Sequence, residues 1–173
     1  MSETNEAPVT ARIALGEGGA LNLNGTRYGR GGPKEVAALI KALGEPDDTT
    51  SRTCFKYNMT ERRWNDLVIY SLKKEFRDEG SPAVWKAGGI SSWRYDDTLS
   101  SEAPPWASIK GPQGIGFGTT AAEVKAIYKK LEIFDVSTDG NNIDVFAGDT
   151  TGATYELDAK KRVEAMHAGG FEC

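Results

Sequence analysis

Apolar residues recur at helical spacing after Pro33. Four of them follow the i, i+3, i+4, i+7 pattern that gathers side chains on one helix face: Val36, Leu39, Ile40 and Leu43. Proline suits the first turn of a helix, and Gly44 and Pro46 are residues that end one. This pattern predicts an amphipathic helix that begins at Pro33 and ends before Gly44.

A second helix is predicted after Thr120. Thr120 and Glu123 have the spacing of a capping box, in which each side chain bonds the backbone N–H group of the other residue. The apolar face then repeats at helical spacing: Val124, Ile127, Tyr128 and Leu131. Residues 35–47 and 123–135 are identical at six of thirteen positions, which suggests an internal repeat.

The remaining apolar segments predict strands. Residues 67–72 and 90–95 are rich in β-branched and aromatic side chains. Residues 13–28 should form short strands or a hairpin. Three short strands near the end, separated by turn-forming residues, should make an antiparallel meander: 143–146, 153–157 and 162–166.

Each half of the chain therefore contains a helix followed by strands. We predict an α+β fold in which two tandem helix-then-antiparallel-strand units form one mostly antiparallel sheet, with the two helices packed on one face. The units are residues 13–99 and 113–173, and residues 100–112 form the connecting loop of one compact domain. Residues 1–12 are largely polar and aperiodic, which is typical of a flexible N-terminal tether.

Length and charge narrow the possible functions. The chain has 173 residues, with 21 Lys and Arg against 25 Asp and Glu, and a formal net charge of −4. Because no basic cluster is present to neutralise phosphates, nucleic acid is not an expected partner. The first residues lack the features of a signal peptide, and the longest apolar run, residues 36–40, is too short to cross a membrane. The polar start is either a frayed cytosolic terminus or the tether left after removal of a signal or lipid anchor.

Two cysteines, Cys54 and Cys173, leave two alternatives open. They are either unrelated free thiols or the two halves of one disulfide, which would suit an oxidising compartment. Closing so long a loop would stabilise the fold by roughly 4–5 kcal/mol in the chain-entropy model. A structural zinc site is not expected, because His167 is the single histidine.

No catalytic, cofactor-binding or metal-binding residues are predicted. The glycine-rich run from Gly114 to Gly118 lacks the preceding strand and the spacing of a nucleotide-binding loop. His167 has no serine nucleophile in a suitable motif. The acidic pairs and turns lack the alternating pattern of a calcium loop: Asp47–Asp48, Asp96–Asp97 and Asp139–Asn142.

Aromatic residues interleaved with basic ones supply the candidate site. Trp, Tyr and Arg dominate protein interfaces because they bury large areas at low entropic cost. One alternative is that these aromatics fill a core that is short of aliphatic residues. The other is that they form a partner-binding face, composed of Trp64, Trp85, Trp93, Arg94, Tyr95 and Trp106.

Three runs carry a resemblance to a known group of proteins: residues 43–47, residues 114–124 and residues 168–173. With these runs the chain resembles small secreted lipoproteins of actinobacteria. More distantly, its tandem plan is similar to β-lactamase inhibitory protein and to the small lipoproteins of outer-membrane protein assembly. The resemblance implies a disulfide between Cys54 and Cys173, and it implies action by binding proteins or envelope components rather than catalysis. Inhibition of a β-lactamase is not carried over, since no contact residue of the inhibitor can be matched.

The expected function is a non-catalytic, extracytoplasmic binding or accessory module of a bacterial cell envelope, as the soluble part of a lipoprotein. Its partner would be a protein or an envelope component, and it would meet the membrane only through a removed N-terminal anchor. No cofactor is expected. A secreted inhibitor that occludes an enzyme, or a small hydrolase with an unrecognised site, are the alternatives.

Overall fold

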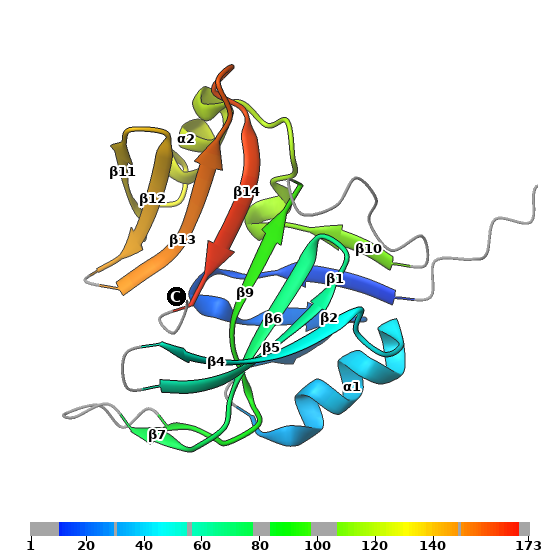
Figure 1. The fold of residues 1–173 in the computed structure, drawn as a ribbon. Coiled ribbons are helices and arrows are strands. Elements are labelled where there is room, and N and C mark those ends of the chain that lie inside the picture. Colours follow the sequence, from blue (N-terminus) through cyan, green and yellow to red (C-terminus); the bar gives the residue numbers. More distant parts are fainter. Residues whose placement is uncertain are drawn as a thin grey trace, which may run out of the picture.

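The computed structural model describes residues 11–29, 31–54, 57–77, 84–97, 107–148 and 150–169, without the side chains of Cys54, Trp85, Ala107 and Thr150. Within these ranges the protein has the predicted α+β fold, with two α-helices and mostly antiparallel strands. Figure 1 shows one large twisted sheet that runs from β11 to β4, with α2 near one end and α1 near the other.

Both predicted helices are present. Helix α1 spans Pro33–Leu43 and ends at Gly44, whose backbone φ of +83° favours glycine and whose N–H group donates to the carbonyl of Ile40. Helix α2 spans Ala121–Lys129, and its N-cap Thr120 accepts a hydrogen bond from the N–H group of Glu123 at 3.2 Å. The predicted apolar face extended to Leu131, which lies beyond the end of α2 and is half-buried against the core.

The large sheet contains eight strands, and every neighbouring pair is antiparallel. The predictions for residues 67–72, for residues 90–95 and for the C-terminal meander are confirmed. In spatial order the strands are β11 (Asp135–Asp139), β12 (Asn142–Ala147), β13 (Thr150–Leu157), β14 (Val163–Ala168), β9 (Ile90–Asp96), β6 (Leu67–Leu72), β5 (Tyr57–Trp64) and β4 (Asp48–Cys54).

The prediction of a single sheet is wrong, because the described strands form three. A four-stranded sheet has the order β10 (Ala107–Lys110), β1 (Ala11–Leu15), β2 (Leu21–Leu23) and β3 (Thr26–Tyr28). Strand β10 pairs in parallel with β1, and β7 (Phe76–Arg77) pairs antiparallel with β8 (Val84–Trp85). Two single-turn 3₁₀ helices, η1 (Glu17–Gly19) and η2 (Pro112–Gly114), complete the described elements.

Two predicted boundaries change with this second sheet. The tether was expected to include residues 11 and 12, but these belong to β1, and the connecting loop contains β10. The reason is burial, because Ala11, Ile13 and Leu15 alternate with exposed residues and enter the core. Residues 1–10 and 98–106 lie outside the described residues.

One face of the eight-stranded sheet, here called the inner face, carries the core. Strand register places a row of side chains across this face: Thr138, Ile143, Tyr155, Met166, Tyr95, Leu67 and Trp64. All of them except Thr138 are buried, and the same core includes side chains from α1, α2, β1 and β2. Burial of this apolar surface is the main stabilising term of the fold.

Two indole groups of the inner face also tie loops to the sheet. The Nε1–H group of Trp64 donates to the carbonyl of Gly44 at 2.9 Å, just after α1. The Nε1–H group of Trp93 donates to the carbonyl of Gly16 at 2.9 Å, between β1 and η1. Each indole therefore buries a large ring and still satisfies its polar N–H group.

Glu35, in the first turn of α1, joins three parts of the chain. It is 3% exposed, and its carboxylate accepts hydrogen bonds from the backbone N–H groups of Gly29, Gly31 and Ile90. The distances are 2.7 Å for Gly31 and 3.2 Å for Ile90. A buried carboxylate needs such donors, so Glu35 fixes the start of α1 against the β3–α1 connection and the start of β9.

A second buried polar group links α2 to the sheet. The hydroxyl groups of Tyr128 and Tyr155 lie 2.6 Å apart, and that of Tyr128 donates to Oε1 of Glu17 at 2.9 Å. Gln113 donates to the same Glu17 oxygen at 2.9 Å. Burial is the main cause that raises the pKa of both tyrosines above the ordinary value of 10.0, so both stay protonated in the folded protein.

Candidate functional site

The opposite face of the eight-stranded sheet, here called the outer face, carries a continuous row of mostly polar residues. Residues paired across antiparallel strands point to the same face, and sequence neighbours in a strand point to opposite faces. The outer row therefore lies on the other side of the sheet from the inner-face row. It crosses all eight strands: Ser137, Asp144, Thr154, His167, Arg94, Val68, Arg63 and Asp48. Seven of the eight side chains in the row are polar, whereas the row behind it is almost wholly apolar.

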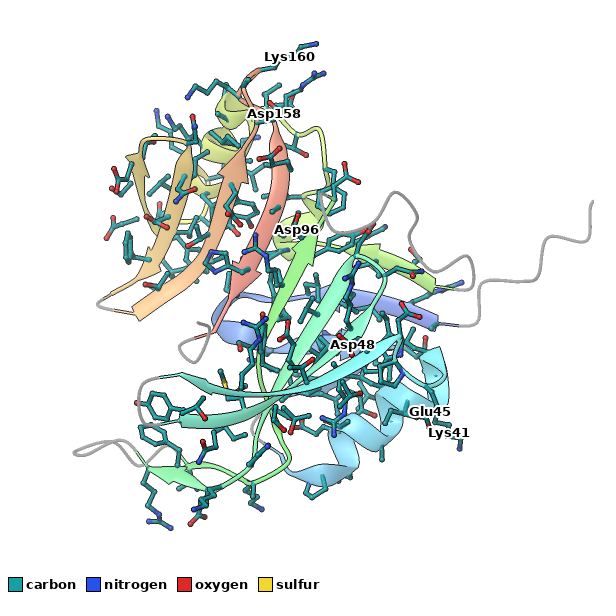
Figure 2. All side chains as sticks on the ribbon, in the orientation of Figure 1. Lys41, Glu45, Asp48, Asp96, Asp158 and Lys160 are labelled. Carbon is teal, nitrogen blue, oxygen red and sulfur yellow. The ribbon has the colours of Figure 1, made fainter. Side chains whose placement is uncertain are left out.

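Arg94 is the centre of the row. Its guanidinium group lies 2.8 Å from Oδ2 of Asp96 and 2.7 Å from Oε2 of Glu156, so it joins β9 to β13 across β14. The Nε atom also donates to Oδ2 of Asp96 at 2.9 Å. Such a two-sided clamp holds the arginine side chain in one orientation on the outer face. Figure 2 shows Asp96 at the end of β9.

On the β14 side, His167 lies between two polar neighbours. It is paired in register with Arg94 on β9 and with Thr154 on β13. The hydroxyl group of Thr154 donates to Oδ1 of Asp144 on β12 at 2.7 Å. The side chains of β12, β13, β14 and β9 therefore present a pre-ordered surface of fixed donors and acceptors.

The two ends of the outer face differ in character. At the β4–β6 end a small apolar cluster is buried: Met59, Val68, Tyr70 and Leu72. Phe76 of β7 packs against this cluster and meets Tyr57 edge-on, with 4.8 Å between ring centroids. At the other end, the outer-face residues of β11 to β13 include four carboxylates: Asp135, Asp139, Asp144 and Glu156.

Large apolar side chains are rare on the described surface. Within the described ranges, Ile133 is the single large hydrophobic residue with high exposure, at 75%. The outer face therefore differs from an exposed hydrophobic patch. It carries charged and hydrogen-bonding side chains on an ordered sheet.

The predicted aromatic face is not assembled as an exposed surface. Trp64, Trp93 and Tyr95 are 2%, 0% and 7% exposed and belong to the inner-face core, so the core-filling alternative describes them. Arg94 alternates with them along β9 and points to the outer face. The side chain of Trp85, in β8, and the whole of Trp106 lie outside the described residues.

The cysteine pairing also lies outside the described residues. Cys54 is the last residue of β4, and the structure describes its backbone but not its side chain. The whole of Cys173 lies outside the described residues. The expected Cys54–Cys173 disulfide therefore stays a prediction.

Other candidate chemistry finds little geometric support in the described segments. The run from Gly114 to Gly118 forms no strand, since Gly114 is the last residue of the 3₁₀ helix η2 and Gly118 lies in a turn, with φ values of +75° and +84°. No group of three or more His, Cys, Asp or Glu side chains among the described residues could hold a metal ion.

The polar row was missed at the sequence level, although a signal for it is present. In β12 buried and outer-face residues alternate with a period of two, as in Ile143, Asp144 and Val145, and in β9 the less buried Arg94 lies between Trp93 and Tyr95. Reading Arg94 together with Trp93 and Tyr95 as one face ignored this alternation. Applied strand by strand, it separates Asp144, Thr154, His167 and Arg94 from the core.

The comparisons with known proteins complete this description. None of the helices in the described part of the chain has the length and apolarity needed to span a membrane. Comparison with family models, with curated proteins and with solved structures found no match for this chain.

Proposed function

We propose that this protein is a non-catalytic binding module whose outer sheet face docks a folded protein partner. The observation that carries the proposal is the polar row, which crosses all eight strands opposite the core. A β-sheet needs only one buried face for stability, so an ordered polar second face is available for recognition. The clamp of Arg94 by Asp96 and Glu156 supports this, because pre-ordered charges lose little entropy on binding.

We further propose that the module works outside the cytoplasm, in a bacterial cell envelope, as the soluble part of a lipoprotein. The resemblance to secreted actinobacterial lipoproteins and the two cysteines support this location. The partner would then be an envelope protein, and the charged row indicates a partner surface with complementary charge rather than an apolar one.

The proposal includes a fold built from two tandem units with both helices on one side of the sheet. The first unit, residues 13–99, would hold α1 and contribute β4, β5, β6 and β9 to the large sheet, and the second, residues 113–173, would hold α2 and contribute β11 to β14. The sheet order supports this division, since each set of four strands is contiguous and the two sets meet where β9 pairs with β14. Core side chains from both helices support the placement on the inner side.

Site-specific photo-cross-linking tests the proposed surface. Benzoylphenylalanine would replace Asp48 and, separately, Asp144, which lie toward opposite ends of the polar row. Control proteins would carry it at Lys41 on α1 or Glu123 on α2, both exposed helix positions. Figure 2 shows Asp48 at the start of β4 and Lys41 on α1. Each protein would be mixed with the envelope fraction of the source bacterium and illuminated.

The proposal expects one protein to cross-link from Asp48 and from Asp144, and not from the helix positions. Cross-links that form only from Lys41 or Glu123 would place the binding surface on the helices and overturn it. The absence of any specific cross-link from the sheet face at protein concentrations of about 0.1 mM would also overturn it, because specific recognition is expected to have a dissociation constant below about 0.1 mM.

A further inference from the structure

The edge of the eight-stranded sheet at β11, together with the groove between β11 and α2, forms a second candidate surface. We propose that this edge binds an extended peptide segment with alternating character: basic side chains toward the outer face, and apolar or acidic side chains toward α2. The peptide would add a ninth strand to the sheet. This inference does not depend on the function proposed for the polar row, because it rests on the free backbone edge of β11 and on the groove beside it.

The first support is the free backbone of β11. In the described sheet β11 has a neighbour, β12, on one side only. The two-residue turn pairs Asp139 with Asn142, and such a pair is hydrogen-bonded in both directions. Alternation along the ladder then directs the N–H and C=O groups of Val136 and Thr138 away from β12. An incoming strand would find these four groups in position.

The second support is a groove beside this edge. It has a volume of 460 Å³ and is bordered by Lys125 and Lys129 of α2, by Glu132 of the α2–β11 connection and by the β11 residues Asp135, Val136 and Thr138. Leu131 and Phe134, both half-buried, supply apolar surface. Ile133, 75% exposed, lies in the same α2–β11 connection. Side chains of an added strand that point toward α2 would enter this groove.

The charged side chains around β11 indicate which kind of peptide would bind. On the α2 wall of the groove, Lys125 and Lys129 are exposed, and neither forms an ion pair with any residue that the structure describes, although Glu132 and Asp135 line the same groove. On the outer face, β11 presents Asp135 and Asp139 on either side of Ser137. A strand that places acidic or apolar residues beside the lysines and basic residues beside the aspartates matches both sides.

The same charges argue against a second copy of this chain as the occupant. Antiparallel self-pairing of two β11 strands about Ser137 would place Asp135 of each copy opposite Asp139 of the other. Like charges directly opposite each other destabilise a strand pair. The aspartates thus protect the edge from self-association and leave it open to a basic strand.

A synthetic peptide tests the inference directly. The probe is the acetylated and amidated heptapeptide Lys-Val-Lys-Glu-Lys-Val-Lys, labelled with fluorescein and titrated with the full-length protein by fluorescence anisotropy. A peptide of equal composition without alternation, Lys-Lys-Val-Glu-Val-Lys-Lys, controls for charge. A third peptide carries N-methyl groups on both valines, which removes two of the three backbone donors that would face β11.

Protein variants locate the binding. Lys125→Glu combined with Lys129→Glu reverses the groove wall, and the matched control makes the same changes at Lys34 and Lys41 on the exposed side of α1. Thr138→Pro removes an N–H group that faces the free edge, a position where an edge strand tolerates proline. Far-ultraviolet circular dichroism and urea unfolding check that each variant folds.

The proposal expects the alternating peptide to bind at least about tenfold more tightly than the scrambled and N-methylated peptides. The groove double variant and Thr138→Pro should each weaken it by about tenfold or more, whereas the α1 control should stay within about twofold. Equal affinity for the alternating and scrambled peptides, or no binding up to about 1 mM, would overturn it. A dimer formed through β11, detected by sedimentation and lost in Thr138→Pro, would also contradict it. If Thr138→Pro fails to fold, the N-methylated peptide still decides the backbone contact.

Discussion

Replacement of Glu35 is the most informative perturbation of the fold. Its carboxylate satisfies three backbone N–H groups, those of Gly29, Gly31 and Ile90, from two separate parts of the chain. A buried donor left without a partner costs about 1–3 kcal/mol, and the sites of Gly29 and Gly31 are half-buried whereas that of Ile90 is buried, so we expect Glu35→Ala to lower the free energy of unfolding by about 3–5 kcal/mol. Glu35→Gln keeps the shape but presents an NH₂ group to one of the donors, so it should cost about 1–3 kcal/mol.

Urea unfolding followed by tryptophan fluorescence measures both variants. The matched control is Glu123→Ala, because Glu123 occupies the equivalent position at the start of α2 but is exposed. That change should cost less than about 1 kcal/mol, the size of an interaction between a charge and a helix terminus. If Glu35→Ala cost no more than Glu123→Ala, the three hydrogen bonds would contribute nothing measurable, and the structural role given to Glu35 would be wrong.

Three further variants probe other contacts. Trp93→Phe removes an indole donor and leaves a smaller ring in the core, so the free energy of unfolding should fall by about 2–4 kcal/mol in urea titrations. Burial raises the pKa of Tyr128 and of Tyr155 above 10.0, so above pH 10.0 these tyrosines ionise in the unfolded chain before they do in the folded protein. Their contribution to the free energy of unfolding is therefore fully present below pH 10.0 and is lost as pH rises above it. Each tyrosine adds about 1.4 kcal/mol per pH unit to this loss, so Tyr128→Phe should remove about half of their combined slope in alkaline unfolding titrations. The backbone N–H of Arg162 is the main cause that holds the pKa of Asp158 below 3.8, so its contribution is present above pH 3.8 and is lost as pH falls through the lower folded value. Asp158→Asn should therefore lower the midpoint temperature of thermal unfolding at neutral pH. The difference from the parent protein should disappear at about pH 2.

The elements that the sequence predicted well combine periodicity with strong terminal residues. Helix α1 has Pro33 in its first turn and Gly44 after its last residue, so both ends and the buried face follow from local chemistry. Strand β6 was equally clear, because its six residues are all buried and form a continuous run bounded by polar turns.

The strands that escaped prediction lack an apolar signal of their own. Strand β4 is polar and contains three threonines, and its existence depends on pairing with β5 rather than on burial. Strand β10 is four residues long and forms by parallel pairing with β1, nearly a hundred positions earlier in the chain. Such long-range partners cannot be read from a local pattern.

The candidate site shows the same limit in another form. Composition drew attention to Trp93 and Tyr95, but alternation along β9 sends them to the core and sends Arg94 to the other face. The cross-strand row that contains Arg94 and His167 exists only once the register of eight strands is known. Strand register, rather than residue type, makes this surface.

Charge reversal on the outer face tests the central claim most directly. The double variant Asp144→Lys with Arg63→Glu inverts two charges of the polar row without touching the core, and Lys41→Glu with Glu123→Lys makes the same exchange on the helices. The affinity of the cross-linked partner for each protein would be measured by isothermal titration calorimetry. Binding through the polar row predicts a loss of about tenfold or more for the outer-face variant and a change within about twofold for the control. Unchanged affinity of the outer-face variant would contradict the proposal that this face is the binding surface.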